Sequence, residues 1–408
     1  MTFFEELKWR GLVQEISSPD LIDKLNNGGL TFYIGTDPTA DSMHIGHYSS
    51  FLITKRLAKA GHHPILLVGG ATGLIGDPKP TAERPMISKE EVDKNFKALK
   101  KQAEDIFGFE VVNNYDWTKD INVIDFLRDY GKYFNVNYML AKDKVKTRLE
   151  SGITFAEFSY MILQALDFLY LYQTKNCVLQ VAGSDQWGNI TSGIELIRKK
   201  LDKEAYGMVI PLVTDSNGVK FGKTEGNALW LDKSKTSSYE LYQYLINLED
   251  CMIIDYLKKL TFLSKEEIED IEKRHLLHPE DREAHRILAR EVISDLHGEE
   301  EFLRAEAISK ALFSGKIEDF SASDVEDVFK GLKPFVIDGD ILLIDLLVNA
   351  GICSSKREAR EFISNSSITL NGKKVTDLDF LITKNVCIGQ KYIVIRRGKK
   401  KYYVVTYV

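Results

Sequence analysis

Two histidines near residue 45 are the first side chains whose type and spacing suit chemistry. His44 and His47 flank an isoleucine and Gly46, after the apolar run LTFYIG and the loop TDPTADSM. Helical periodicity begins here, with Asp41 or Ser42 as the expected N-cap. Free backbone N–H groups and the helix dipole attract phosphate, and imidazoles add donors. The i, i+3 spacing differs from the i, i+4 spacing of the two histidines in zinc proteases, so no metal is expected. The alternative is that both histidines are ordinary residues of a first helical turn.

A second cluster lies far along the chain, in the sequence KFGKT. Lys220, Lys223 and the hydroxyl of Thr224 surround Gly222 in a polar loop, which suits a clamp on a polyphosphate. A Walker P-loop would need a glycine at the position of Asn217, so that interpretation is rejected. The alternative is a solvated basic turn.

A third group of polar side chains falls on one predicted helix and after one predicted strand. Tyr160, Gln164 and Asp167 share a face of the helix FAEFSYMILQALDFLYLY, at i, i+4 and i+7. Asp185 and Gln186 follow the strand CVLQVAG, at the end where doubly wound sheets bind ligands. The alternatives are a solvated helix face and a simple helix cap.

The elements that must position these side chains alternate between strand and helix. Strands are predicted at LTFYIG, PILLVGG, FEVVNN, CVLQVAG and MVIPLVT. Helices are predicted over residues 44–60, 90–104 and 136–173 and in GNITSGIELIRKK. This alternation predicts an α/β fold, a doubly wound parallel sheet of Rossmann type that ends near Thr214.

The second half of the chain has a different pattern. Amphipathic helices without strands fill residues 237–313 and predict an all-helical domain. Residues 314–340, with GLKP and DGD, predict a linker. Short helices and the strands SITLNGKKV, KYIVIRRG and KYYVVTYV then predict a small α+β module.

Composition excludes intrinsically disordered and collagen-like proteins. With 408 residues, 44% of them apolar and 28% charged, the chain is typical of a globular protein of two or three domains. No signal sequence or membrane-length apolar run is present, which predicts a cytoplasmic protein. Four dispersed cysteines predict reduced, buried thiols.

The net charge of −6 is unevenly distributed along the chain. Residues 341–408 carry 12 basic and five acidic residues, which favours a polyanionic partner such as nucleic acid.

These motifs together resemble a known family. HIGH at residues 44–47, followed 176 positions later by KFGKT, resembles the ordered signature pair of class I aminoacyl-tRNA synthetases. With YIGTDPTADSMHIGH, GATGLIGDP, FSYMILQALDF and GSDQWGNI, the chain is similar to the bacterial-type tyrosyl-tRNA synthetases over nearly its whole length. The resemblance implies activation of L-tyrosine with ATP to tyrosyl-adenylate, then transfer to tRNA(Tyr). It also implies Mg²⁺ with the nucleotide and no bound prosthetic group.

The resemblance also implies roles for individual residues. It assigns the tyrosine pocket to Tyr33, Asp77, Tyr160, Gln164, Asp167 and Gln186. Within this pocket it assigns the substrate ammonium group to Tyr160, Gln164 and Asp77, and the phenolic hydroxyl to Tyr33 and Asp167. It assigns ATP binding to Gly35, Asp37, Thr39, His44, Gly46, His47, Arg84, Asp185, Lys220 and Lys223. It assigns catalysis to Thr39, His44, His47, Lys220, Lys223 and Thr224.

Two positions depart from the family pattern. Ile34 stands where a small polar residue often meets the ribose, and it cannot donate a hydrogen bond. The loop GDPKPTAER is shorter than expected by one residue, so the equivalence of Lys79 with a pyrophosphate-binding lysine is open.

The domain organisation and partners follow from the same resemblance. It implies a catalytic domain over 1–220, a helical anticodon-binding domain over 221–325 that starts with the signature loop, and a basic RNA-binding module over 341–408. In that module the candidate phosphate contacts are Lys356, Arg357, Arg360, Lys373 and Lys374. Relatives are homodimers, which implies the same here. Two rivals stay open: a tryptophanyl-tRNA synthetase, and a non-catalytic RNA-binding protein with a synthetase-like body.

Overall fold

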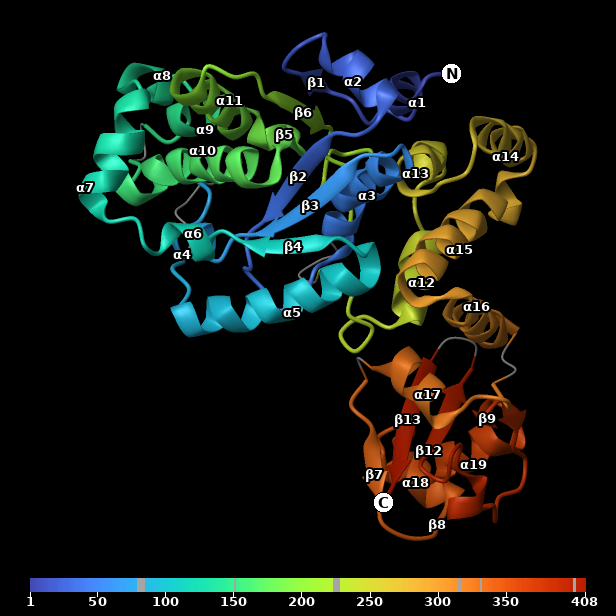
Figure 1. Cartoon of the computed structure of the whole chain (residues 1–408). Coiled ribbons are helices and arrows are strands. Elements are labelled where there is room, and N and C mark those ends of the chain that lie inside the picture. Colours follow the sequence, from blue (N-terminus) through green and yellow to red (C-terminus); the bar gives the residue numbers. More distant parts are fainter. Residues whose placement is uncertain (79–84, 150–151, 223–227, 315–316, 331, 399–400) are drawn as a thin grey trace. The chain divides into compact units, whose positions relative to one another are not determined.

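The computed structural model describes residues 1–78, 85–149, 152–222, 228–314, 317–330, 332–398 and 401–408 (Figure 1). Contacts between its residues divide the chain into two compact units, one of residues 1–236 and 248–288 and one of residues 237–247 and 289–408. Among the described residues, no helix has the length and apolar character needed to cross a membrane.

The first unit is built on a six-stranded sheet with the order β1-β6-β5-β2-β3-β4. Its strands are β1 (Glu15–Ile16), β2 (Thr31–Thr36), β3 (His63–Val68), β4 (Glu110–Asn113), β5 (Cys177–Gly183) and β6 (Tyr206–Ile210). All neighbours pair in parallel except β1, which is antiparallel to β6. The predicted doubly wound α/β sheet and all five of its predicted strands are confirmed.

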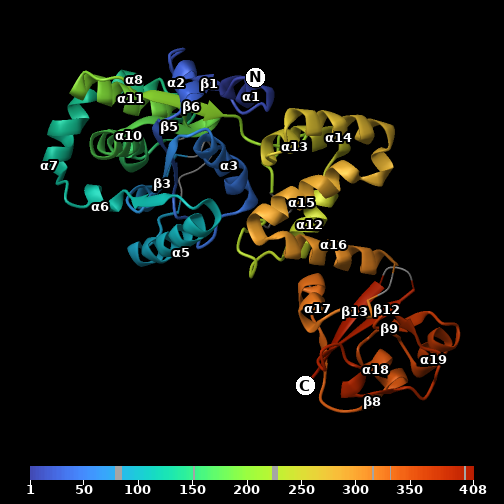
Figure 2. The same ribbon diagram turned by 45° about the vertical axis from the view of Figure 1, so that its right-hand side comes forward.

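Helices cover both faces of this sheet (Figures 1 and 2). Helices α3 (Ile45–Lys59) and α5 (Lys89–Phe107) pack near β3 and β4, and α10 (Phe155–Lys175) and α11 (Trp187–Leu201) pack near β5 and β6. Short helices complete the layer: α1 (Phe3–Trp9), α2 (Leu21–Asn27), α4 (Thr72–Ile75), α6 (Tyr115–Thr118), α7 (Val123–Asp125), α8 (Val136–Leu140) and α9 (Asp143–Lys146). The chain runs from β2 outward to β4 and then returns to β5 on the other side of β2. Ligands of doubly wound sheets bind at this reversal, outside the carboxyl ends of the two strands.

The single helix predicted over residues 136–173 is wrong. The structure has α8, α9 and α10 in its place. Gly152 has a φ of +88°, a left-handed conformation that a helix cannot contain. Thr154 then starts α10, because its side chain accepts the backbone N–H of Glu157. Local capping therefore overrides the apolar periodicity.

The predicted helices of the second half are present, but they do not form one compact body. The first unit contains α13 (Ile253–Leu260), α14 (Lys265–Leu277) and the start of α15 (Glu283–His297); the second unit contains α12 (Ser238–Ile246), the end of α15 and α16 (Glu299–Ser314). The three-domain division expected from the sequence stays a prediction.

The rest of the second unit is a small α+β module. Its five-stranded sheet has the order β10-β9-β12-β13-β7, and β8 pairs with β11 separately. Its elements are α17 (Ala322–Phe329), β7 (Phe335–Ile337), β8 (Ile341–Leu342), α18 (Leu343–Asn349), α19 (Lys356–Ser364), β9 (Ile368–Leu370), β10 (Lys373–Lys374), β11 (Leu381–Ile382), β12 (Tyr392–Arg397) and β13 (Lys401–Tyr407). The linker predicted over residues 314–340 is wrong where α17 and β7 form. Val325 is buried in a core with Ile317 and Val394, and β7 pairs with β13.

The four cysteines are free thiols. Cys177, Cys353 and Cys387 are buried as predicted, but Cys251 is exposed. It lies in a short 3₁₀ turn, η4 (Asp250–Met252), that precedes α13.

Candidate active site

A cavity of about 260 Å³ opens at the carboxyl ends of β2 and β5, where the strand order reverses. It is lined by Tyr33, Ile34, Gly35, Thr36, Asp37, Thr39, His47, Ser50, Phe51, Leu67, Thr72, Asp77, Tyr160, Gln164, Asp167, Gln180, Ala182, Gly183, Asp185, Gln186 and Leu212. A second cavity shares Asp37, Thr39, His47, Ser50 and Leu212 with the first. Its other lining residues include His44, Gly46 and Lys220. The two cavities are therefore contiguous.

At the inner end of the first cavity lie a phenol and a carboxylate. Tyr33 is 1% exposed, and its hydroxyl has no hydrogen-bond partner among the described residues. Asp167 accepts one hydrogen bond from Asn114 Nδ2 and one from Trp117 Nε1, both at 2.9 Å. Burial raises the pKa of Asp167 to about 7 despite these two donors, and burial beside Asp167 raises the pKa of Tyr33 well above its usual value. In the described part of the chain, nothing at this end accepts from or donates to the Tyr33 hydroxyl.

Further along the cavity, Asp37 is held by two donors. Tyr160 Oη donates to Asp37 Oδ2 at 2.9 Å, and Thr72 Oγ1 donates to Asp37 Oδ1 at 2.7 Å. Gly69 makes this approach possible, because a Cβ there would lie 2.1 Å from Thr72 Oγ1 and 2.3 Å from Asp37 Oδ1. Gly69, the first glycine of GGATG, therefore allows the Asp37 carboxylate to be held close to the backbone.

Asp77 belongs to an amide network on the same wall. Gln186 Nε2 donates to Asp77 Oδ2 at 3.1 Å. Asn189 Nδ2 lies within 3.2 Å of Asp77 Oδ1, 3.0 Å of Gln164 Oε1 and 2.9 Å of Gln186 Oε1. Asn189 thus positions three of the predicted site residues. Together with Asp37, Asp77 makes this wall attractive to a cation such as an ammonium group.

The second cavity is built at the start of α3, but its cap is not the predicted one. The N-cap is His44 itself, rather than Asp41 or Ser42: Gly46 N–H donates to His44 Nδ1 at 3.1 Å, and His44 N–H donates to His47 Nδ1 at 3.1 Å. Since each Nδ1 accepts a hydrogen bond, each ring carries its proton on Nε2. The ring centroids are 3.9 Å apart. Burial, followed by the charges of His44 and Lys220, lowers the pKa of His47 to about 3, so its ring is neutral at physiological pH.

The backbone amides of this first turn are already used. Ile45 N–H donates to Leu229 O at 2.8 Å, Gly46 N–H to His44 Nδ1, and His47 N–H to His44 O at 2.8 Å. The prediction that free amides bind phosphate here is therefore wrong. At this turn an anion would therefore meet the imidazole side chains and the helix dipole rather than free amides.

The described part of the KFGKT sequence packs against the start of α3. A Cβ on Gly222, which has a φ of +78°, would lie 1.8 Å from Ile45 Cγ2. Phe221 is buried against Tyr256, with ring centroids 5.0 Å apart, and its N–H donates to Val213 O at 2.9 Å. These contacts fix the chain directly beside His44. The predicted residues Lys79, Arg84, Lys223 and Thr224 lie outside the described residues.

Comparison with known proteins identifies the family of this chain. A family model described as tRNA synthetases class I (W and Y) matches residues 25–314, and a model of the tyrosine–tRNA ligase SYY-like C-terminal domain matches residues 324–405. The tyrosine–tRNA ligase of Geobacillus stearothermophilus is 51% identical over 418 aligned positions that cover 100% of both chains. Tyrosine–tRNA ligase 1 of Bacillus subtilis (strain 168) is 50% identical over 416 positions, 99% of each chain. The chain belongs to the tyrosyl-tRNA synthetase family.

A solved structure of the family has the same fold. A C-terminally truncated mitochondrial tyrosyl-tRNA synthetase of Aspergillus nidulans matches 76% of this chain and 94% of its own, with a TM-score of 0.67 and 31% identity. The tyrosyl-tRNA synthetase of Archaeoglobus fulgidus, at 16% identity and a TM-score of 0.55, shares the fold alone.

The structure brings together all the described small-molecule site residues that the sequence predicts for this synthetase family. Each of them lines one of the two contiguous cavities. Ile34 also lines the first cavity, so an apolar side chain does stand at that position. Sequence reasoning missed Thr72, Asn114, Trp117 and Asn189. Two of them had a usable signal: Asn114 follows β4, at the same sheet edge as the other site residues, and Asn189 lies in the quoted motif GSDQWGNI.

The predicted RNA contacts lie in the second unit. Lys356, Arg357 and Arg360 are exposed on α19, whose opposite face buries Ala359 and Ile363. Lys373 and Lys374 are exposed on β10.

Proposed function

We propose that this protein is a tyrosine–tRNA ligase that forms tyrosyl-adenylate from L-tyrosine and ATP and transfers the tyrosyl group to the 3′ end of tRNA(Tyr). The observation that carries the proposal is the buried Tyr33 hydroxyl, which has no described partner and lines the same cavity as the Asp167 carboxylate. Buried polar groups are almost always paired, so an unpaired one in a cavity points to a polar ligand. A phenolic hydroxyl that accepts from Tyr33 and donates to Asp167 satisfies both.

Selectivity for tyrosine follows from these two groups. Phenylalanine would leave the buried Tyr33 hydroxyl without a partner, which is unfavourable, and would give Asp167 no donor beyond Asn114 and Trp117. A site built to hydrogen-bond a substrate hydroxyl rejects an analogue that lacks it, and tyrosyl-tRNA synthetases are the standard example of this discrimination. Asp77, Tyr160 and Gln164 line the same cavity and would bind the ammonium group, with Gln186 beside them.

The second cavity would hold the triphosphate. The substrate carboxylate attacks the α-phosphorus, a new P–O bond forms, and pyrophosphate leaves with its bonding electrons. Negative charge that builds on the phosphates in the transition state would be stabilised by Thr39, His44, His47 and Lys220, and by Lys223, Thr224 and Arg84 from outside the described residues. Gly35, Asp37, Gly46 and Asp185 would contact the nucleotide. Mg²⁺ carried by the nucleotide would neutralise phosphate charge.

tRNA would bind to the second half of the chain. The basic residues Lys356, Arg357, Arg360, Lys373 and Lys374 are the proposed phosphate contacts. We assign catalysis to residues 1–220, anticodon binding to 221–325 and further RNA contacts to 341–408. The proposed location is the cytoplasm, where tRNA and ATP are available.

A homodimer is the proposed assembly, and an exposed apolar groove supports it. The groove has a volume of about 380 Å³ and is lined mainly by side chains of α7, the turn after it and the start of α10, among them Val123, Leu127 and Phe155. Phe155 is 73% exposed and Val123 is 67% exposed. Exposed apolar groups gathered in this way are typical of protein interfaces.

A charge in this groove tests the dimer. Phe155→Asp is expected to convert the dimer to a monomer, because an interfacial carboxylate would be buried without a partner. Light scattering coupled to size-exclusion chromatography measures the mass. Phe313→Asp is the matched control, since Phe313 is 97% exposed and lies outside the groove. A monomeric wild-type protein would reject the assembly.

The function itself is tested by exchange of labelled pyrophosphate into ATP, measured with each of the 20 amino acids in turn. Exchange driven by tyrosine is the expected result. Exchange driven by tryptophan would favour the rival synthetase, and a folded protein that binds tRNA without any exchange would favour the non-catalytic rival.

A further inference from the structure

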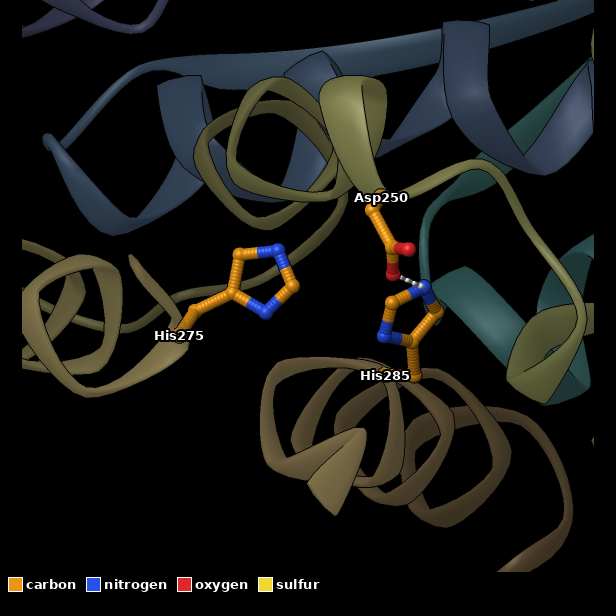
Figure 3. Close-up of side chains that lie close together, drawn as sticks. All are labelled: Asp250, His275 and His285. Atoms are coloured by element: carbon orange, nitrogen blue, oxygen red, sulfur yellow. Dashed lines mark ion pairs between the residues drawn. The ribbon is translucent and has the colours of Figure 1, made fainter. Parts of the chain in front are cut away.

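Two buried imidazoles outside the active site each have one ring nitrogen without a hydrogen-bond partner among the described residues. His275, near the end of α14, is 7% exposed, and His285, in α15, is 0% exposed. The Nδ1 atom of each ring is buried and has no hydrogen-bond partner in the described part of the chain. The ring centroids are 5.8 Å apart. Figure 3 shows the two rings side by side, with the Asp250 carboxylate next to the Nε2 edge of His285.

The other nitrogen of His285 is already committed. His285 Nε2 lies 3.0 Å from Leu248 O and 3.4 Å from Asp250 Oδ1. Both are acceptors, so Nε2 carries the proton and Nδ1 has a bare lone pair. A neutral imidazole oriented by an N–H bond to a carbonyl or carboxylate is the usual state of a metal-binding histidine.

We propose that His275, His285 and Asp250 form a binding site for a divalent transition-metal ion of the Zn²⁺ class. One potential ligand atom from each residue lies within 4.8 Å of the others. Two imidazoles with one carboxylate favour Zn²⁺ and similar ions over Mg²⁺ or Ca²⁺, which prefer oxygen ligands alone. Tetrahedral Zn²⁺ with bonds of about 2.1 Å spaces its ligands by about 3.4 Å, so the side chains must close slightly. Asp250 Oδ1 lies on the Nε2 side of His285, so the Asp250 carboxylate, which is 52% exposed, must turn away from Nε2 to reach an ion held at Nδ1. Leu248 O would still accept the Nε2 proton.

The surrounding charge predicts moderate affinity. Arg282 Nη1 lies 4.0 Å from Asp250 Oδ1, and Arg282 Nη2 donates to Leu248 O at 2.9 Å. This cation competes with the metal for the Asp250 carboxylate, so we expect micromolar binding, with water completing the coordination.

The ion would act on structure rather than on catalysis. It would link η4, α14 and the start of α15, which are separate segments of the first unit. None of the three ligands lines either active-site cavity. The proposal therefore stands apart from the ligase function, and its readouts are metal affinity and Tm.

Calorimetric titration of the full chain with ZnCl₂ tests the site, in a Cys251→Ser background because Cys251 is an exposed thiol beside Asp250. We expect one equivalent to bind with micromolar affinity and to raise Tm. His275→Asn and Asp250→Asn are each expected to weaken binding at least about tenfold. Asp250→Asn keeps the side-chain shape, so it is informative even if His275→Asn fails to fold. The control is His278→Asn, whose side chain is 68% exposed, and it should bind Zn²⁺ like the parent.

Cobalt gives a second readout. Co²⁺ in a four- or five-coordinate nitrogen and oxygen site absorbs visible light, and this absorption should be present in the parent and lost in His275→Asn. Absence of Zn²⁺ binding at millimolar concentration would overturn the proposal. Unchanged affinity in both His275→Asn and Asp250→Asn would overturn it as well, because the bound ion would then lie elsewhere.

Discussion

The two ends of the active site hold their polar groups in opposite ways. At the inner end, the Tyr33 hydroxyl is buried without a described partner beside the carboxylate of Asp167. At the outer end, the imidazoles of His44 and His47 and the first-turn amides are bonded to one another and to Leu229. The inner end leaves a polar group for the substrate to satisfy, which selects the substrate. The outer end is fixed in advance, which suits charge stabilisation in a transition state.

The pKa values of the titrating groups at the two ends are also shifted in opposite directions. Burial raises the pKa of Asp167 from 3.8 to about 7 and lowers the pKa of His47 from 6.5 to about 3. Both shifts favour the neutral form. The free site therefore carries less charge than its residue types suggest, and the comparison between its ends can be tested by rate, by pH and by stability.

The largest expected effect is on the rate, at the outer end. His44→Ala removes an imidazole N–H from the phosphate cavity and is expected to lower kcat for tyrosine-dependent pyrophosphate exchange by about 10²–10³-fold. Tyrosine affinity, measured by equilibrium dialysis, should not change, because the phenol pocket is intact. The variant should also lose about 1 kcal/mol of stability, because His44 is the N-cap of α3.

His44→Asn separates the cap from the catalytic role. Asparagine is a favourable N-cap and can accept the Gly46 N–H, so stability should return while the rate stays low. A rate that recovers together with stability would show that His44 acts only as a cap.

The outer end also shows where sequence reasoning fails. The strands and the ordered motifs were predictable because apolar runs and spacing are local properties. The N-cap was not, since the rings of His44 and His47 satisfy the amides that Asp41 or Ser42 were expected to cap. Asn114 and Trp117 were missed because they are about 50 positions from Asp167 and meet it only through the fold. The three proposed metal ligands are spread over η4, α14 and α15, so the sequence contains no motif for them.

The next effect is on the pH dependence of stability, measured by urea unfolding of the free protein. In the folded state Asp167 keeps its proton up to about pH 7, whereas in the unfolded chain it releases the proton near pH 4. This group therefore lowers the unfolding free energy as the pH rises from about 4 to 7. In the unfolded chain His47 is protonated below about pH 6.5, whereas in the folded state its ring stays neutral down to about pH 3. This group therefore raises the unfolding free energy as the pH rises from about 3 to 6.5. The two contributions oppose one another over a shared window.

Single variants should expose each contribution. Between about pH 4.5 and 6, Asp167→Asn should make the slope of the unfolding free energy more positive by about 1.4 kcal/mol per pH unit. His47→Asn, whose amide oxygen can still accept the His44 N–H, should make the slope more negative by a similar amount. Curves parallel to that of the wild type would mean that neither group is held neutral by the fold.

The smallest effect compares two buried phenols. Tyr33→Phe removes a hydroxyl without a described partner, whereas Tyr160→Phe removes one that donates to Asp37 at 2.9 Å. Tyr33→Phe is expected to raise the unfolding free energy by about 1 kcal/mol, and Tyr160→Phe to lower it by about 1 kcal/mol. Tyr33→Phe should nevertheless raise the KM for tyrosine by about tenfold and reduce discrimination against phenylalanine.

If Tyr33→Phe raises the unfolding free energy and weakens tyrosine binding, the Tyr33 hydroxyl serves substrate binding and destabilises the free protein. An equal loss of stability in the two variants would contradict this. It would mean that an ordered water already satisfies Tyr33 in the free protein, so that the substrate hydroxyl displaces a partner rather than supplying the missing one.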